Sequence, residues 1–285
     1  MAQEDDILVP ASGDFAAWPK GHPHCIAVDW DGTCKDTMVP KWKAGFNLAI
    51  PRIWPALAPY QKEIDRICWD VNLVEETAGV QRFVGLSIMM ARWAKMGLPA
   101  PDLSAFTKAV QAVSARGEKH GIDTYRRLQK EYGYDDSPLL WSDLSDKIIA
   151  ENTKGAKLFD NCRSALEGVV GRADLLVVSA SKTEAVRRDI VHDRMTHLFK
   201  ALLAQDFLPK PGILKGLAGV YEHVLFVGDT AEDVRAAKSA GVPLFLVKVG
   251  DEAASWAKAP AIFDRFLRGE SFPGGVMGRE SREAL

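Results

Sequence analysis

The chain has 285 residues, of which 47% are hydrophobic and 26% are charged, and its formal net charge at pH 7 is −2. This composition is typical of a globular protein with room for one large domain, or for a core domain with an insertion. The small net charge argues against a nucleic-acid or membrane-surface partner. Because the acidic N-terminus lacks the apolar segment of a signal peptide and no apolar run could span a membrane, we expect a cytoplasmic protein.

Four short apolar segments have the pattern of buried parallel strands, at residues 24–29, 174–179, 223–229 and 243–248. Helical patterns alternate with them, at about 182–196, 212–221 and 230–240. This alternation predicts an α/β fold with a doubly wound parallel sheet. Since ligands bind beyond the carboxyl ends of the strands in such sheets, we expect Asp29, Ser179 and Asp229 to face one crevice.

Residues 36–156 differ from the rest of the chain because they carry amphipathic helical patterns and no convincing strand. The clearest helical segments are 103–115, 122–132 and 139–151. We interpret this stretch as a helical domain inserted after the first strand, between the two parts of a core formed by residues 1–35 and 157–285. Residues 1–22 are expected to form a loose lead-in, since prolines and glycines interrupt any long element there.

The first candidate motif, Asp29-Trp30-Asp31-Gly32-Thr33, ends the first predicted strand. Two carboxylates two residues apart on an extended chain point the same way. Because they repel each other, their proton affinities separate, and one can stay an ionised nucleophile while the other carries a proton. An exposed Asp-rich turn would have the same pattern.

The second candidate motif is VVSASK, in which Ser179 ends the second predicted strand. A hydroxyl at this place, beside the free N–H groups of a helix start, can bind an anion such as phosphate. The same residues would also suit a plain helix N-cap, with Ser181 or Thr183 in that role.

The third candidate is a lysine. A site that holds several carboxylates and a phosphate dianion needs positive charge, since two charges about 4 Å apart interact by roughly 4 kcal/mol at an effective dielectric of about 20. One lysine and one divalent cation would supply it. Lys210, in an expected loop before Pro211, is the preferred residue, and Lys215, expected on the solvated side of the next helix, is the reserve.

The fourth candidate motif places Asp229 at the end of the third predicted strand, directly before a helix. Asp233 would follow one turn later on the same side of that helix. Carboxylate oxygens of this kind suit Mg²⁺. Alternatively, Asp229 or Thr230 caps the helix and Asp233 is an ordinary first-turn acid.

Taken together, the segments DWDGT, VVSAS, the lysine of LPKPGIL, and VGDTAEDVRAAKSAG resemble the motifs of the haloacid dehalogenase (HAD) superfamily, in its phosphatase branch. The resemblance covers roughly residues 22–36 and 157–250. It implies a Rossmann-like core, and the inserted helical domain resembles the C1-type cap of that group.

The resemblance implies that Asp29 is the nucleophile that attacks phosphorus and is also a ligand of Mg²⁺, the expected cofactor. Asp31 would be the general acid and base, and its backbone carbonyl would be a further metal ligand. Asp229 would complete the protein ligands. Asp233 would hold metal-bound waters, and so belong to the metal site, or would anchor the lysine.

The resemblance also implies a phosphate-binding group. Ser179 and Ala180 would bind the phosphate oxygens, and Thr33 lies where backbone or side-chain contacts to phosphate are usual. Lys210 would balance the charge of the nucleophile and the phosphate.

A magnesium-dependent phosphohydrolase with an aspartyl-phosphate intermediate is the leading interpretation, because Asp31 can protonate a leaving alkoxide and then activate water. The alternatives are a phosphomutase-like phosphoryl-transfer enzyme, a phosphonatase-like hydrolase, and a non-catalytic phosphate-binding module. A phosphonatase-like enzyme fits less well, since such members have a small residue where Asp31 stands.

The inserted domain is expected to select the substrate, for which a small phosphorylated metabolite is the favoured class. Its candidate substrate contacts are Lys41, Trp42 and Arg82. The competing interpretation is that the tryptophan belongs to the core and the basic residues are solvated. No feature of the sequence specifies an oligomeric state.

Overall fold

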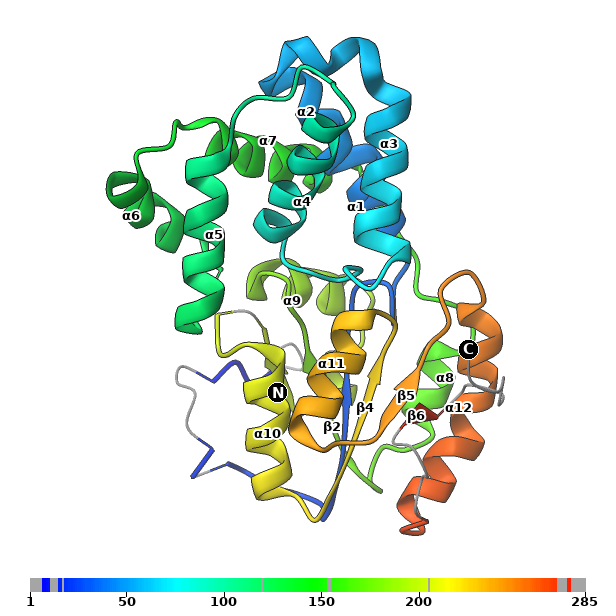
Figure 1. The fold of residues 1–285 in the computed structure, drawn as a ribbon. Helices are drawn as coiled ribbons and strands as arrows, with labels where there is room; N and C mark the ends of the chain where they lie inside the picture. The colour runs from blue at the N-terminus through cyan, green and yellow to red at the C-terminus, as the bar shows by residue number, and fades with distance from the viewer. Residues whose placement is uncertain are drawn as a thin grey trace. The chain divides into compact units, whose positions relative to one another are not determined.

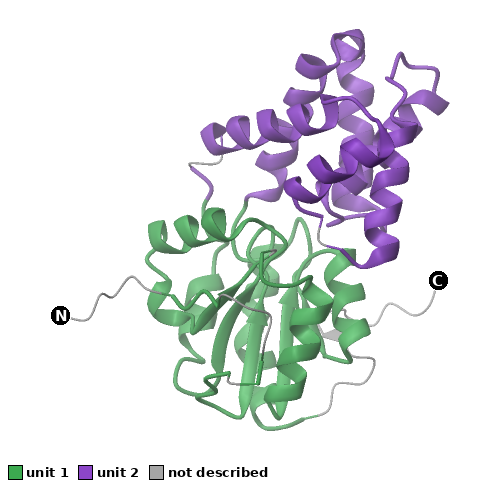
Figure 2. Cartoon of the chain, turned by 90° about the vertical axis from the view of Figure 1, so that its left-hand side faces the viewer, with its two compact units in different colours: residues 1–36, 157–285 green, residues 37–156 purple. Residues whose placement is uncertain are grey.

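The computed structural model describes residues 7–10, 15–16, 18–118, 120–152, 155–204 and 206–270, and the backbone of 276–277. The chain divides into two compact units (Figure 2), which we call the sheet unit, residues 1–36 with 157–285, and the helical unit, residues 37–156. The predicted lead-in over 1–22 falls partly outside the described residues, as does the tail beyond residue 270.

The sheet unit is built on six parallel strands in the order β3-β2-β1-β4-β5-β6 (Figure 1). The strands are β1 His24–Val28, β2 Asp174–Val178, β3 Ala201–Leu203, β4 His223–Gly228, β5 Leu244–Leu246 and β6 Val276–Met277. This arrangement confirms the predicted parallel α/β sheet. Val28 of β1 pairs with Val227 of β4, so the residues that follow these two strands lie side by side at the carboxyl edge.

Helices cover both faces of the sheet, because successive side chains of a strand point to opposite faces. The helices are α8 Cys162–Glu167, α9 Thr183–His192, the short 3₁₀ helix η4 Thr196–Leu198, α10 Lys210–Val220, α11 Ala231–Ala240 and α12 Glu252–Leu267. Ile26 and Val28 belong to one apolar cluster with residues of α8, α9 and α12, whereas Cys25 and Ala27 belong to another with residues of α10 and α11. Strands β1 to β5 are largely buried between these two layers, as their apolar sequences require.

The helical unit contains helices and no strand among its described residues. Its elements are α1 Met38–Lys41, η1 Trp42–Phe46, α2 Asn47–Ile53, η2 Pro55–Tyr60, α3 Gln61–Trp69, η3 Asp70–Val74, α4 Arg82–Lys95, α5 Ser104–Arg116, α6 Ile122–Tyr132 and α7 Ser137–Asn152. They enclose one apolar cluster rich in aromatic rings, which include Phe83, Phe106, Tyr125 and Trp141. Across the described part of both units, no helix is both long enough and apolar enough to cross a membrane.

Two elements of the sheet unit differ from the sequence-based expectations. β3 was not predicted, because three residues are too few to form a readable pattern. α12 spans 16 residues with Pro260 inside it, and the helical patterns described above do not extend to it. Proline usually ends a helix, so the helical turns before it were not evident.

Candidate functional site

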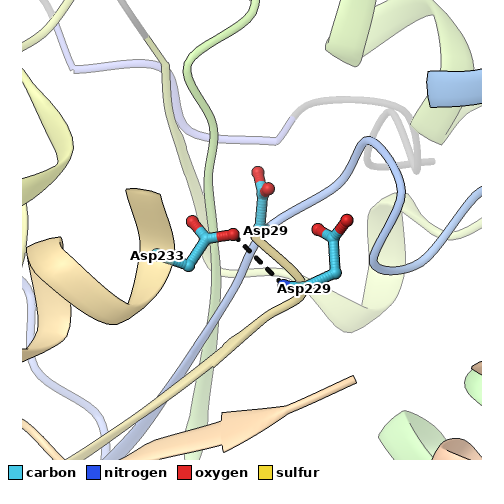
Figure 3. A group of neighbouring side chains, drawn as sticks. All are labelled: Asp29, Asp229 and Asp233. Atoms are coloured by element: carbon cyan, nitrogen blue, oxygen red, sulfur yellow. Dashed lines mark hydrogen bonds between the residues drawn. The ribbon is translucent and has the colours of Figure 1, made fainter. Parts of the chain in front are cut away.

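Three buried carboxylates gather at the carboxyl edge of the sheet (Figure 3). Asp29 directly follows β1, Asp229 directly follows β4, and Asp233 lies in the first turn of α11. One ligand oxygen from each lies within 4.8 Å of the others. Gly228 makes the approach possible, since a Cβ there would lie 2.6 Å from the Cβ of Asp233. The register of β1 and β4 thus brings together carboxylates that are 200 residues apart in the chain.

Lys210 supplies the positive charge of this cluster. Its Nζ lies 2.9 Å from Asp29 Oδ2 and 2.6 Å from Asp233 Oδ1, and the side chain is buried. Lys215, the reserve candidate, is exposed on the same helix. Lys210 is the first residue of α10 and not part of a loop, because Pro211 is tolerated within the first turn of a helix, where its missing N–H costs nothing.

Asp233 orders the start of α11 as well as binding the lysine. Its Oδ2 accepts hydrogen bonds from the backbone N–H of Asp229 at 3.1 Å (the dashed line in Figure 3), the N–H of Thr230 at 3.0 Å and the Thr230 hydroxyl at 2.8 Å. Thr230 Oγ1 in turn accepts the N–H of Asp233, which completes a capping box. Both oxygens of Asp233 therefore have protein partners, and the geometry favours the lysine-anchoring role over metal contact.

The remaining polar residues of the motifs form a second set of contacts. The Thr33 hydroxyl donates to Asp229 Oδ1 at 2.6 Å. The Ser181 hydroxyl donates a short hydrogen bond to Asp31 Oδ2, and the Ser181 N–H donates to Ser179 Oγ at 3.1 Å. Ser181 is thus a partner of Asp31 and not the cap of α9, whose N-cap residue is Lys182.

The electrostatic balance of the cluster disfavours the ionised forms of Asp29 and Asp229 and favours that of Asp233. Burial, and to a lesser extent Asp233 and Asp31, raise the pKa of Asp29 to about 7, although Lys210 acts in the opposite direction. Burial and the two neighbouring carboxylates also raise the pKa of Asp229 well above its ordinary value. Burial opposes ionisation of Asp233 too, but Lys210 and Thr230 outweigh it and lower the pKa of that carboxyl.

A divalent cation fits this donor set. The pKa of Lys210 is raised, because Asp233 and Asp29 outweigh the effect of its burial, so one ammonium is set against three carboxylates. The donors are all oxygen, which suits Mg²⁺ and disfavours a soft metal. Asp29 and Asp229 each offer an oxygen to this cluster, whereas the side chain of Asp31 accepts a hydrogen bond from Ser181.

The predicted substrate contacts belong to the helical unit. Trp42 is buried and packs against Phe46 with ring centroids 4.3 Å apart. Arg82 donates to Asp146 at 2.6 Å and lies over the Phe46 ring at 4.9 Å. Lys41 is half-buried at the end of α1. These contacts support the core interpretation for Trp42 and an ion pair for Arg82, so their contact with a substrate stays a prediction.

The sequence suggested only a capping role for Ser181, not its contact with Asp31, and it gave no role to Trp256. The indole N–H of Trp256 donates to the Thr33 carbonyl at 2.7 Å. The spacing of Trp256, Ala259, Phe263 and Phe266, all buried on α12, is the helical signal that could have placed this residue inside the core.

Comparisons with known proteins agree with the fold. A family model described as haloacid dehalogenase-like hydrolase matches residues 107–247, a range that contains Ser179, Lys210, Asp229 and Asp233 and begins after Asp29. No curated protein matches the sequence significantly.

Several solved structures are similar to the chain at low sequence identity. A candidate haloacid dehalogenase-like hydrolase from Bacteroides fragilis has a TM-score of 0.50 at 15% identity, over 81% of this chain and 92% of that one. A protein described as a predicted phosphoglycolate phosphatase from Haemophilus somnus 129PT has a TM-score of 0.45 at 18% identity, over 84% and 97%. A candidate β-phosphoglucomutase from Thermotoga maritima has a TM-score of 0.43 at 18% identity, over 85% and 99%.

Proposed function

The chain belongs to the haloacid dehalogenase-like hydrolases, and we propose that it is a magnesium-dependent phosphohydrolase that forms an aspartyl-phosphate on Asp29. The observation that carries this proposal is the surplus of buried negative charge, with the carboxylates of Asp29, Asp229 and Asp233 set against the ammonium of Lys210. A protein without a cation at this place would hold protons on its acids instead, as the raised pKa values of Asp29 and Asp229 indicate.

Asp29, Asp229 and the backbone carbonyl of Asp31 are the groups that would hold Mg²⁺. The bound ion would neutralise charge on the carboxylates and on the phosphoryl oxygens. Lys210 restrains Asp29 through the 2.9 Å contact and is itself fixed by Asp233, so the nucleophile is oriented before substrate arrives. Ser179 and the N–H groups at Ala180 and beyond would bind the phosphoryl oxygens.

Two carboxylates divide the chemistry. In the first step the Asp29 carboxylate forms a bond to phosphorus as the bond to the ester oxygen breaks, and Asp31 gives that oxygen the proton with which it leaves as an alcohol. In the second step Asp31 takes a proton from water, the water oxygen attacks phosphorus, and inorganic phosphate leaves with Asp29 restored. Supporting this division, Asp29 is paired with a lysine whereas Asp31 is paired with a neutral hydroxyl.

The substrate class is proposed to be a small phosphorylated metabolite, with the helical unit acting as the selecting cap and the enzyme located in the cytoplasm. The test is release of inorganic phosphate from an aryl phosphate and from a panel of phosphorylated metabolites, with Mg²⁺ and with a chelator. We expect Mg²⁺-dependent turnover by the wild type and none above background by Asp29→Asn. Phosphate release equal to substrate consumed would distinguish hydrolysis from phosphoryl transfer to a second substrate.

Asp31→Asn provides the internal control for the acid–base role. An aryloxide leaves without protonation far more readily than an alkoxide, so this variant should lose more activity on an alkyl phosphate than on an aryl phosphate. Equal rates for wild type and Asp29→Asn would remove the proposed mechanism. Equal losses on both substrates for Asp31→Asn would remove Asp31 from the leaving-group step.

A further inference from the structure

Trp256 connects the last long helix of the sheet unit to the loop that follows β1. It is fully buried on α12, and its ring packs edge-on against Phe245 of β5 with centroids 6.4 Å apart and planes at 89°. Its indole N–H donates to the carbonyl of Thr33 at 2.7 Å, across 223 residues of chain. An acceptor stabilises a buried indole N–H, and here the acceptor belongs to the motif that carries Asp29 and Asp31.

Thr33 extends this connection to the metal-binding carboxylate. The residue is fully buried, and its hydroxyl donates to Asp229 Oδ1 at 2.6 Å. A hydroxyl that donates to a carboxylate oxygen restricts the rotation of that carboxylate. Hydrogen bonds therefore run from Trp256 to Thr33 and from Thr33 to Asp229.

The loop that follows β1 and carries Thr33 turns sharply at Gly32. Gly32 has a φ of 78°, in the left-handed region that glycine adopts without strain. The turn is closed by the Gly32 N–H, which donates to the Lys35 carbonyl at 2.9 Å. The Thr33 carbonyl takes no part in this closure. The hydrogen bond from Trp256 instead holds this carbonyl, and so restrains the backbone of the residue whose side chain bears the hydroxyl.

We propose that Trp256 is a positioning residue of the metal site, which holds Asp229 in place through Thr33. The inference rests on the proposed function only in that the site takes a divalent cation. Groups that orient a metal ligand contribute to metal affinity although they never touch the ion, and their loss costs about 10-fold to 100-fold. Trp256 acts through Thr33, so we expect a loss of about threefold to tenfold, at or below the lower end of that range.

A purely structural role is the competing explanation, and the chain offers a matched control for it. Trp141 is also fully buried, and its indole N–H donates to the Phe46 carbonyl at 3.2 Å inside the helical unit. Trp141→Phe and Trp256→Phe each remove an indole N–H donor and retain a buried ring. Only Trp256 is connected to the carboxylate site, through its hydrogen bond to Thr33. A structural role alone predicts similar effects of the two changes.

The experiment measures binding of Mn²⁺ alone by calorimetry and by the paramagnetic resonance of the free ion, in the absence of substrate. Trp256→Phe should bind Mn²⁺ about threefold to tenfold more weakly than wild type, and Trp141→Phe should bind it equally. Thr33→Ser, which keeps the hydroxyl, should retain most of the affinity that Thr33→Val loses. In the Thr33→Val background, Trp256→Phe should cause no further loss, because the connection is already broken.

The outcomes separate this inference from the proposed function. Wild-type protein that binds no Mn²⁺ would overturn the metal site itself. Wild-type binding with no difference between the Trp256 and Trp141 variants would overturn the positioning role alone. Should Trp256→Phe not fold, the indole N–H resonance of Trp256 in the wild type gives the same answer. It should shift on addition of Mg²⁺ while that of Trp141 does not, and an unchanged Trp256 resonance would contradict the proposal.

Discussion

The two ends of the sheet each bury carboxylate, and they satisfy it in opposite ways. At the amino end, Asp174 begins β2, and its Oδ2 accepts the Gly21 N–H at 2.7 Å and the Tyr221 hydroxyl at 2.8 Å. Lys200 Nζ lies 3.5 Å from the same oxygen. One acid therefore has two neutral donors and one cation, and its requirements are met within the protein.

At the carboxyl end the balance is reversed. Asp29 and Asp233 both contact the ammonium of Lys210, whereas Asp229 accepts a hydrogen bond from the neutral Thr33 hydroxyl. The pKa values of Asp29 and Asp229 are raised as a result of burial and repulsion between the carboxylates. A buried carboxylate by itself therefore does not mark a functional site. The distinguishing feature is charge that the protein leaves uncompensated and an external cation can neutralise.

The largest difference between the two ends should appear when one acid at each is neutralised. Asp229→Asn removes a proposed ligand of Mg²⁺, and we expect phosphate release to fall by about a thousandfold or more at fixed Mg²⁺. Asp174→Asn should lower stability and leave kcat within about twofold, since it lies at the opposite edge. Steady-state kinetics well below each variant's melting temperature make the comparison. A large loss of kcat in folded Asp174→Asn would contradict the division of roles.

The cation of the carboxyl end should have the next largest effect. Lys210→Met leaves Asp29 and Asp233 without their ammonium, and we expect kcat to fall by about a hundredfold to a thousandfold, as for loss of one electrostatic contact to the transition state. Lys215→Met, an exposed change on the same helix, is the control and should be silent. Comparable losses of kcat in the two variants would contradict the assignment of the charge-balancing role to Lys210.

A smaller effect concerns the pH dependence of stability without metal. The folded protein raises the pKa of Asp29 from 3.8 to about 7, so between these values it binds more protons than the unfolded chain. The free energy of unfolding should therefore fall as pH rises from about 4 to about 7, by an amount on the order of a few kcal/mol. Asp29→Asn should lose the part of this slope that Asp29 contributes, while Asp229, whose pKa is also raised, keeps its own part, and the variant should be more stable than wild type at pH 8 in chelator.

Urea unfolding at pH 5 and pH 8 tests this expectation, with chelator and with Mg²⁺. Added Mg²⁺ should flatten the slope of the wild type, because the ion favours the ionised carboxylates that protons otherwise neutralise. The variant provides the control for all other titrating groups. An identical slope in wild type and Asp29→Asn would show that Asp29 is not the group responsible.

The contrast also explains how far sequence reasoning could go. The strands that end in Asp29 and Asp229 are apolar runs closed by a carboxylate, so both the parallel sheet and the meeting of these acids at one edge followed from local pattern. β3 has three residues and left no such pattern. The sequence predicted that the carboxyl edge needs a lysine and preferred Lys210 to Lys215, but it expected Lys210 in a loop, whereas Lys210 begins α10 with its ammonium beside Asp29.

Contacts between distant segments lay beyond the reach of local pattern. The bond from Trp256 to Thr33 spans 223 residues, and the bond from Ser181 to Asp31 spans 150. Neither hydrogen bond leaves a periodic pattern in the sequence, because a single contact of this kind depends on how whole helices and strands pack. The ion pair of Arg82 with Asp146, 64 residues away in the helical unit, was unpredictable for the same reason, and Arg82 was instead predicted to contact substrate.

The smallest predicted effect concerns the hydrogen bonds of Asp174 at the amino end of the sheet. Tyr221→Phe removes the hydroxyl that donates to Asp174 and accepts the Trp18 indole N–H at 2.8 Å. Asp174 retains the Gly21 N–H and Lys200, but Trp18 loses its acceptor as well, so we expect a loss of about 1 to 2 kcal/mol in the free energy of unfolding, at a usual net value of about 1 kcal/mol for each of the two hydrogen bonds. Tyr60→Phe, on a tyrosine that is 37% exposed, should change stability by less than about 0.5 kcal/mol. Neither change should alter Mn²⁺ affinity, because the charge of Asp174 is compensated by its own donors and by Lys200 at the opposite edge of the sheet. A Tyr221→Phe protein with normal stability and weakened Mn²⁺ binding would mean that the two ends of the sheet are electrostatically coupled.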